Sequence, residues 1–222
     1  ALPLESASDD PTRRSTQSER GDGAARSPAQ RAAALAAIAA KVNACELCRL
    51  CKGRTNGVPG EGSPTARVMF VGEGPGATED EQGRPFVGRA GQLLTKIIES
   101  GMGLKREDVF IANVVKCRPP ENRDPMPDEA AMCMPYLHKQ IEVIDPEVII
   151  PLGRHSMREL AGVGPNEGIT KVRGKVYRQR GRAVIPTFHP AYLLRNPPEK
   201  VKVWQDIQLA LKELGLPVPR SA

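Results

Sequence analysis

The chain has 222 residues, of which 40% are hydrophobic and 4% aromatic, which suffices for one packed domain and excludes wholesale disorder. Lysine and arginine number 32 against 26 acidic residues, and the formal net charge of +6 favours a polyanionic partner. The longest apolar run, 32–40, is too short to cross a bilayer, and the first residues lack the pattern of a secretory signal. Five cysteines in a chain without a secretory-signal pattern indicate a metal or cluster site, or spare thiols, rather than a disulfide scaffold.

Residues 1–30 differ from the rest in composition. Their only large apolar residues are Leu2 and Leu4, so they cannot bury a hydrophobic face, and we expect a disordered tail. A single folded domain is predicted over 31–216, followed by a short C-terminal tail over 217–222.

Helical and strand-like segments alternate along the folded part. An Ala-rich helix is expected at 31–42, and further helices are expected at 89–100, 128–144, 154–161 and 200–214. Pro135 should kink or restart the third of these helices. Continuously apolar runs, typical of parallel strands covered on both faces, occur at 67–72, 108–114, 147–152 and 183–188. The pattern predicts an α/β fold, a three-layer α/β/α domain with a central, mostly parallel four-stranded sheet. The carboxyl ends of its strands should hold the functional site.

The cysteines are Cys45, Cys48, Cys51, Cys117 and Cys133. The first two form a C-x2-C pair that can hold one edge of a metal or cluster, but a zinc ribbon would need a second such pair. An iron–sulfur cluster tolerates wider spacing. Buried, unligated cysteines remain the alternative for the last two, and spacing alone leaves the role of Cys51 open.

A glycine-rich loop, GEGPG, spans 72–76 at the end of the first strand. Its glycines allow close approach of a ligand, but Pro75 breaks the dinucleotide pattern and the lysine of a phosphate-binding loop is absent. Phe86 follows in a Pro/Gly loop near Glu79 and Asp80, where its ring can stack on a base or plug the core. The helix after Gly88 offers N-terminal amides to a phosphate or another ligand group.

His189 directly follows the fourth strand and is the best histidine candidate for catalysis, whereas His138 and His155 are expected to be surface or packing residues. Leu193 and Leu194 next to it are interpreted as an exposed wedge for a DNA duplex, or else as a loop packed under the last helix. Residues 171–202 hold nine bases and one acid, with bases alternating along an expected hairpin, which favours a phosphate-facing surface.

Together, GEGPG, the Glu–Asp pair, GRPFVG, N-x3-C-RPP-x-NR and HPAYLLRNP closely resemble the iron–sulfur (family 4) uracil-DNA glycosylases of bacteria and archaea. The resemblance covers about residues 43–214. It implies the fold of that family and release of uracil from DNA, which leaves an abasic site for base excision repair.

The resemblance also implies residue roles. The ligands of a 4Fe-4S cluster fall on Cys45, Cys48, Cys117 and Cys133. Uracil binding falls on Gly74, Phe86, Asn113 and His189, and catalysis on Glu73 and His189. Expected DNA contacts are Leu193, Leu194, Arg195, Arg118 and Arg123.

These roles fit the chemistry of the reaction. Asn113 would read the Watson–Crick edge of an extruded uracil and reject cytosine, while His189 would stabilise the departing anion. Glu73, or else Glu79 or Asp80, would position the water that attacks the sugar. The cluster is expected to be structural and to organise the loop between Cys117 and Cys133.

Two other properties are expected. No histidine lies between Phe86 and Cys117, which disfavours the covalent capture of uracil-DNA found in a related branch, and no catalytic lysine is implied, so the DNA strand should stay intact. The expected enzyme is a monomer of the cytoplasm, at the nucleoid, with no membrane partner and with uracil-containing DNA, single- or double-stranded, as its substrate. A non-catalytic nucleic-acid binder with a structural metal or cluster site of four cysteines is the main alternative, and a nucleotide-dependent redox protein is a weaker one.

Overall fold

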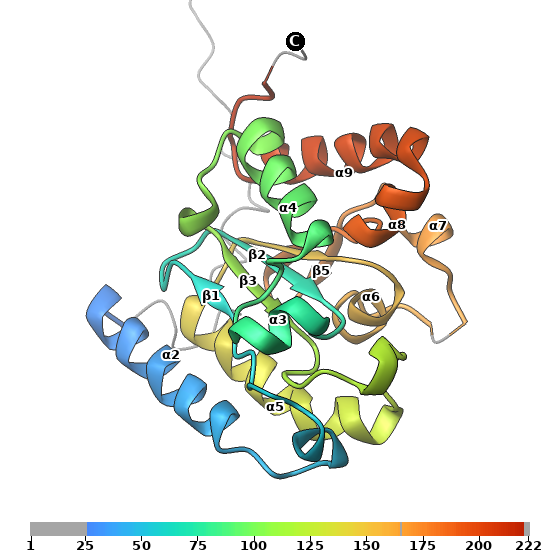
Figure 1. Ribbon diagram of the computed structural model, residues 1–222. Coiled ribbons are helices and arrows are strands. Elements are labelled where there is room, and N and C mark those ends of the chain that lie inside the picture. The colour runs from blue at the N-terminus through green and yellow to red at the C-terminus, as the bar shows by residue number, and fades with distance from the viewer. Residues whose placement is uncertain (1–25, 165, 220–222) are drawn as a thin grey trace, which may run out of the picture.

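The computed structural model describes residues 26–164 and 166–219, so most of the predicted N-terminal tail, residues 1–25, lies outside the described residues. A six-stranded sheet of order β1-β3-β2-β4-β6-β5 forms the centre of the molecule (Figure 1). Its strands are β1 (Glu61–Gly62), β2 (Val68–Gly72), β3 (Phe110–Asn113), β4 (Val148–Pro151), β5 (Tyr177–Gln179) and β6 (Arg182–Val184).

The four predicted strands are confirmed as a parallel unit, because β3, β2, β4 and β6 pair in parallel in this order. The prediction of four strands in all is wrong, since β1 and β5 add antiparallel edges. These edge strands are two and three residues long, too short to leave a hydrophobic period in the sequence. The last parallel strand is also shorter than predicted, although its backbone still pairs with β4 as far as Thr187, whose N–H donates to Pro151 O.

Helices follow and separate the strands. The α-helices are α2 (Pro28–Asn43), α3 (Ala77–Gln82), α4 (Arg89–Lys96), α5 (Pro127–Ile144), α6 (Arg154–Leu160), α7 (Ile169–Val172), α8 (Pro190–Arg195) and α9 (Lys200–Glu213). The single-turn elements are η2 (Arg49–Lys52), η3 (Ile97–Met102), η4 (Arg106–Asp108), η5 (Pro120–Asn122) and η6 (Pro197–Glu199).

Helix α5 is continuous through Pro135, so the expected restart of the helix is wrong. The ring removes one backbone donor, and the carbonyl that loses its partner belongs to Ala131. Both residues lie on the exposed side of the helix, where water can donate to that carbonyl. The missing hydrogen bond therefore costs less free energy than it would in the core.

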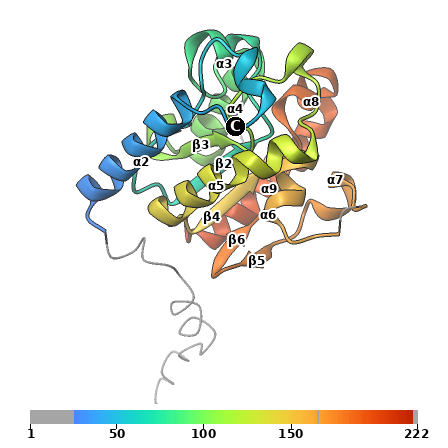
Figure 2. The ribbon, with the colours of Figure 1, turned by 90° about the horizontal axis from the view of Figure 1, so that it is seen from below.

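The two faces of the sheet carry separate hydrophobic cores. Met69 and Val71 of β2 pack toward α5 and α6, while Val68 and Phe70, at alternate positions, pack toward α4 and α9. Helix α2 lies along the outer side of α5 (Figures 1 and 2). This is the predicted three-layer arrangement, extended by α2.

The start of α2 lies before the predicted domain boundary at residue 31. Ser27 and Gln30 form a capping box and Pro28 occupies the first turn, which together begin the helix. Residues 26–30 therefore belong to the folded part. Among the described residues, no helix is both long and apolar enough to cross a membrane.

Four of the nine bases in the stretch 171–202 have acidic partners in the fold, so the stretch is not free as a whole to face phosphates. Arg173 pairs with buried Asp206 at 2.8 Å, and Arg182 pairs with Asp145 at 2.6 Å. Arg178 and Lys202 also have acidic partners. Arg182 opens β6, so it lies at the amino end of the parallel strands, whereas His189 follows their carboxyl ends. Part of this charge thus holds the fold together, Arg182 at the end of the sheet opposite the predicted site and Arg173 against the ring of Phe188 beside His189.

Replacement of Arg173 by methionine should lower the free energy of unfolding by about 3 kcal/mol, because it leaves the Asp206 carboxylate buried without its cation. Urea unfolding measures this loss. Lys175→Met, at an exposed position shortly before β5, is the matched control and should unfold near the wild-type midpoint. Equal stability of the two variants would contradict the structural role of Arg173.

Candidate active site

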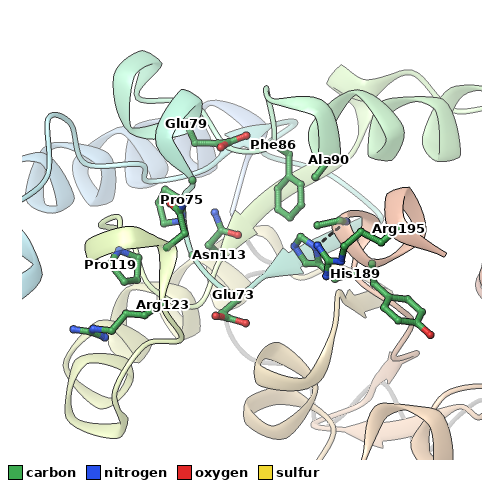
Figure 3. A pocket seen from close by; sticks show the side chains of 15 residues that line it. Glu73, Pro75, Glu79, Phe86, Ala90, Asn113, Pro119, Arg123, His189 and Arg195 are labelled. Atoms are coloured by element: carbon green, nitrogen blue, oxygen red, sulfur yellow. Dashed lines mark hydrogen bonds between the residues drawn. The ribbon is translucent and has the colours of Figure 1, made fainter. Parts of the chain in front are cut away.

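A cavity of about 540 Å³ opens at the carboxyl ends of the parallel strands (Figure 3). Glu73 follows β2, Asn113 ends β3, and His189 follows the segment that continues β6. Because Gly72 and Asn113 are direct partners in the parallel ladder, β2 and β3 end side by side. The predicted residues that line the cavity are Glu73, Gly74, Phe86, Asn113, Arg123, His189 and Arg195.

Phe86 forms one wall of the cavity. Its ring is nearly buried, and its centroid lies 5.6 Å from that of the His189 ring, at an angle of 35°. The backbone of Phe86 has φ +53°, a left-handed conformation that is costly for an aromatic residue. Gly91 permits this close turn, because a Cβ there would lie 1.9 Å from Phe86 O.

Glu79 fixes the loop that carries Phe86. Its Oε1 accepts hydrogen bonds from the N–H groups of Val87 and Gly88, at 2.9 and 2.8 Å. This carboxylate therefore occupies amides at the start of α4 that the sequence offered to a phosphate. Asp80 is buried elsewhere and accepts from the backbone of Thr55 and Asn56. Asp80 thus has a structural role. Glu79 also lines the cavity but is tied to the loop amides, so Glu73 is the cavity carboxylate that is not held by this loop.

Asn113 presents an unpaired acceptor to the cavity. The residue is 1% exposed, and its Oδ1 is buried without a hydrogen-bond partner among the described residues. Gly72 keeps this atom accessible, because a Cβ at that position would lie 2.4 Å from Oδ1 and 2.5 Å from the Phe86 ring. An unpaired buried acceptor is costly, so the site is built for a ligand that donates to it.

His189 caps helix α8 with its side chain, and this bond determines its tautomer. Its Nδ1 accepts from the N–H of Ala191 at 3.1 Å, which leaves the ring proton on Nε2. Burial of the ring lowers the pKa of His189 to about 4. The histidine is therefore a neutral donor at physiological pH.

His155 lies at the site, although the sequence placed it at the surface or in packing. Its Nε2 lies 3.7 Å from Glu73 Oε2 and 2.9 Å from Asp124 Oδ2. Burial raises the pKa of Glu73, attraction to His155 opposes that rise, and Asp124 adds to it. The position of His155 just after β4 could have pointed to this role, since β4 ends at the same edge of the sheet as β2 and β3.

The structure places the expected DNA-contacting residues in different surroundings. Leu193 is fully buried in the core under α9, so the expectation that it is exposed is wrong, while Leu194 is 44% exposed. In a one-turn helix such as α8, adjacent residues point in different directions, which separates the two leucines. Arg123 binds Glu129 with two hydrogen bonds, and Arg118 donates to Asn122 in the same loop.

The cysteines gather at a second place, between α2, η2, the end of β3 and α5. All five border one small hollow. Arg54 donates to Cys117 Sγ at 3.0 Å, and the N–H of Lys116 donates to Cys133 Sγ at 3.2 Å. The Lys116 ammonium is also buried, where it donates to Asn113 O and to Gln140 Oε1.

The sulfur spacing distinguishes between a single zinc ion and a larger cluster. Among the described residues, no three cysteines have their Sγ atoms within 4.8 Å of one another. A tetrahedral zinc site with Zn–S bonds of about 2.3 Å would bring its sulfurs to about 3.8 Å. The wider spacing, the donors to sulfur and the two nearby cations suit a multi-iron cluster with a net negative charge.

Comparisons with known proteins show which family the chain resembles. A family model described as the uracil DNA glycosylase superfamily matches residues 59–208. A protein of Sulfurisphaera tokodaii called "Type-4 uracil-DNA glycosylase" is 50% identical over 185 residues, which cover 81% of this chain and 84% of that protein. Proteins with the same name from Saccharolobus solfataricus and Thermotoga maritima are 51% and 50% identical, over 80% and 78% of this chain and 85% and 91% of their own lengths. The chain therefore belongs to the uracil DNA glycosylase superfamily and, within it, to the type-4 uracil-DNA glycosylases.

Proposed function

We propose that the protein extrudes uracil from DNA into the cavity and hydrolyses its N-glycosidic bond. The unpaired Asn113 Oδ1 carries this proposal. Uracil offers an N3–H donor to that acceptor and an O4 acceptor to the amide group, whereas cytosine offers the opposite pattern. Cytosine would leave buried polar groups unpaired, which is the basis of strong discrimination.

The chemical step needs charge stabilisation on two sides. As the bond between C1′ and N1 breaks, its electron pair passes to uracil and positive charge develops on the sugar. The Nε2–H of His189 donates to uracil O2 and stabilises the anion, in a site from which the ring of Phe86 excludes water. The Glu73 carboxylate offsets the charge on the sugar and orients the water, whose oxygen bonds to C1′ while its proton leaves to solvent.

Cys45, Cys48, Cys117 and Cys133 are the proposed ligands of a 4Fe-4S cluster. Burial raises the pKa of Cys133 to about 11, so a bound cationic centre would be needed to hold it as a thiolate. These cysteines would hold the cluster between the start of the domain, the end of β3 and α5, where it would support the fold and take no part in the hydrolysis. Cys51 borders the same hollow from η2 and lies outside the proposed ligand set.

The product is proposed to be an intact strand with an abasic site. The residues that line the cavity include no lysine in the described part of the chain, which supports hydrolysis without strand cleavage. The partner is uracil-containing DNA, whose phosphates attract a chain of charge +6, and the proposed setting is a monomer at the nucleoid in the cytoplasm.

A labelled oligonucleotide with one uracil tests the proposal. Incubation with excess protein followed by alkali should break the strand at the uracil, whereas without alkali it should stay whole. The same oligonucleotide with cytosine at that position is the control. Tight DNA binding with no alkali-sensitive site would favour the non-catalytic binder instead.

Leu194 is proposed to fill the gap left by the extruded base. Leu194→Ala should slow uracil release from duplex DNA by roughly tenfold, because unstacking costs a few kcal/mol that the wedge partly offsets. Release from single-stranded DNA should change little, and the ratio of the two rates is the measurement. Val201→Ala, at another exposed apolar position, is the control; an equal effect on both substrates would contradict the wedge.

A further inference from the structure

Four charged or titratable side chains meet at the Glu73 side of the cavity, and the family motifs account only for Glu73. His155 Nε2 lies 2.9 Å from Asp124 Oδ2 and 3.7 Å from Glu73 Oε2. Arg154 Nη2 lies 3.0 Å from the same oxygen of Asp124. The histidine thus bridges two carboxylates, one of which is held by an arginine.

The fold brings these residues together from three separate segments. Glu73 follows β2, Arg154 and His155 form the first turn of α6 after β4, and Asp124 belongs to the loop that joins η5 to α5. Gly153 precedes α6 with φ +91°, and a Cβ there would lie 3.2 Å from the Cβ of His189. The turn therefore runs directly beside the catalytic histidine.

Because Glu73 is partly buried, its neighbours influence whether its carboxyl group is ionised. Its side chain is 29% exposed, that of His155 is 24% exposed, and that of Asp124 is 61% exposed. Burial favours the protonated carboxyl, which can neither offset charge on the sugar nor accept from a water. His155 favours the ionised form and Asp124 opposes it, so the two neighbours act on Glu73 in opposite directions.

We propose that His155 is a positioning residue that, held by Asp124, keeps the Glu73 carboxylate ionised and directed into the cavity. This inference rests on the proposed hydrolysis of the glycosidic bond. Asp124 lies between Cys117 and Cys133, so the triad also ties the loop between these cysteines to the catalytic edge of the sheet. Arg154 supplies one positive charge to the group through its contact with Asp124.

Other charged groups also face Glu73, and their influence on its ionisation must be distinguished from that of His155. Arg154 from α6 also attracts the Glu73 carboxylate and lowers its pKa. Across the cavity, burial lowers the pKa of His189 to about 4, so this ring remains neutral above that pH. Arg123 and Arg195 on the cavity wall carry a constant charge. Glu79 also lines the cavity, but its Oε1 is held by the N–H groups of Val87 and Gly88, so Glu73 is the carboxylate expected to produce the acid limb of the rate profile.

Single-turnover rates of uracil release from about pH 5 to about pH 9 test the proposal. In His155→Gln, which keeps a donor but cannot carry charge, the acid limb should move to higher pH. In Asp124→Asn, whose amide oxygen can still accept from His155 while the opposing charge is gone, it should move to lower pH. Both variants should reach the wild-type plateau within about twofold at high pH, where Glu73 is ionised regardless.

Glu73→Gln is the reference variant, and it should lose both the acid limb and most of the rate. Circular dichroism and cluster absorbance at each pH report whether a variant has simply lost its fold. Equal depression of the rate at all pH values, or shifts of the two variants in the same direction, would overturn the role of His155. If the wild-type protein released no uracil at any pH, the proposed function itself would fail.

Discussion

Replacement of His189 by asparagine should lower the rate of uracil release by about 10²–10³-fold, the cost of removing one donor to a developing anion. Asparagine retains an oxygen that can accept from the Ala191 N–H, so the cap of α8 should survive. Its shorter side chain cannot replace the Nε2–H donor. Single-turnover kinetics measure the rate, and thermal unfolding measures whether the cap still stabilises the protein.

His189→Ala is the matched comparison. It should lose the same activity and about 1 kcal/mol of stability in addition, because the Ala191 N–H loses its acceptor. An asparagine variant with near-wild-type activity would mean that another group stabilises the departing uracil.

The protonation of His189 also predicts a pH dependence of stability. The pKa is about 4 in the folded protein and near its ordinary value of about 6.5 in the unfolded chain. Between these values the unfolded chain binds more protons, so the free energy of unfolding should fall as the pH falls from about 6.5 to about 4. His189→Asn should lose this contribution, which urea unfolding at several pH values would reveal.

Replacement of Asn113 by aspartate should lower the rate on uracil by about 10³-fold or more, because a carboxylate repels O4 and cannot donate to it. The side chain keeps its size, so the effect does not require a new void. A carboxylate instead accepts from the amino group of cytosine, and slow release of cytosine is expected. Parallel assays on uracil and cytosine oligonucleotides measure both changes.

Asn122→Asp is the control for the added charge. Asn122 also lines the cavity but is exposed and bonded to Arg118, so its replacement should leave the preference for uracil intact. Loss of uracil release to the same extent in both variants would contradict the reading of the base by Asn113.

The sequence predicted the parallel centre of the fold because buried parallel strands are continuously apolar, as in 67–72 and 147–152. It also predicted that Phe86, Asn113 and His189 meet, since Asn113 and His189 lie at strand ends and Phe86 belongs to the motif that follows the glycine-rich loop. The convergence is confirmed, because all three line one cavity. Strands β1 and β5 were missed because two or three residues carry no period.

Other errors arose where the sequence could not reveal the partner of a side chain. The bases of 171–182 resembled a DNA-binding face, but Arg173 and Arg182 have partners far along the chain. Leu193 and Leu194 were treated as a pair, although a helix directs adjacent residues differently. The role of His155 was missed because its contacts with Glu73 and Asp124 depend on three segments that only the folded sheet brings together.

A crystal structure of the protein with free uracil, the proposed product, tests the arrangement most directly. The ring should stack on Phe86, with Asn113 Oδ1 within about 3 Å of N3 and His189 Nε2 within about 3 Å of O2. Uracil bound elsewhere, or bound in the cavity with its N3 turned toward solvent and Oδ1 still unpaired, would contradict the account.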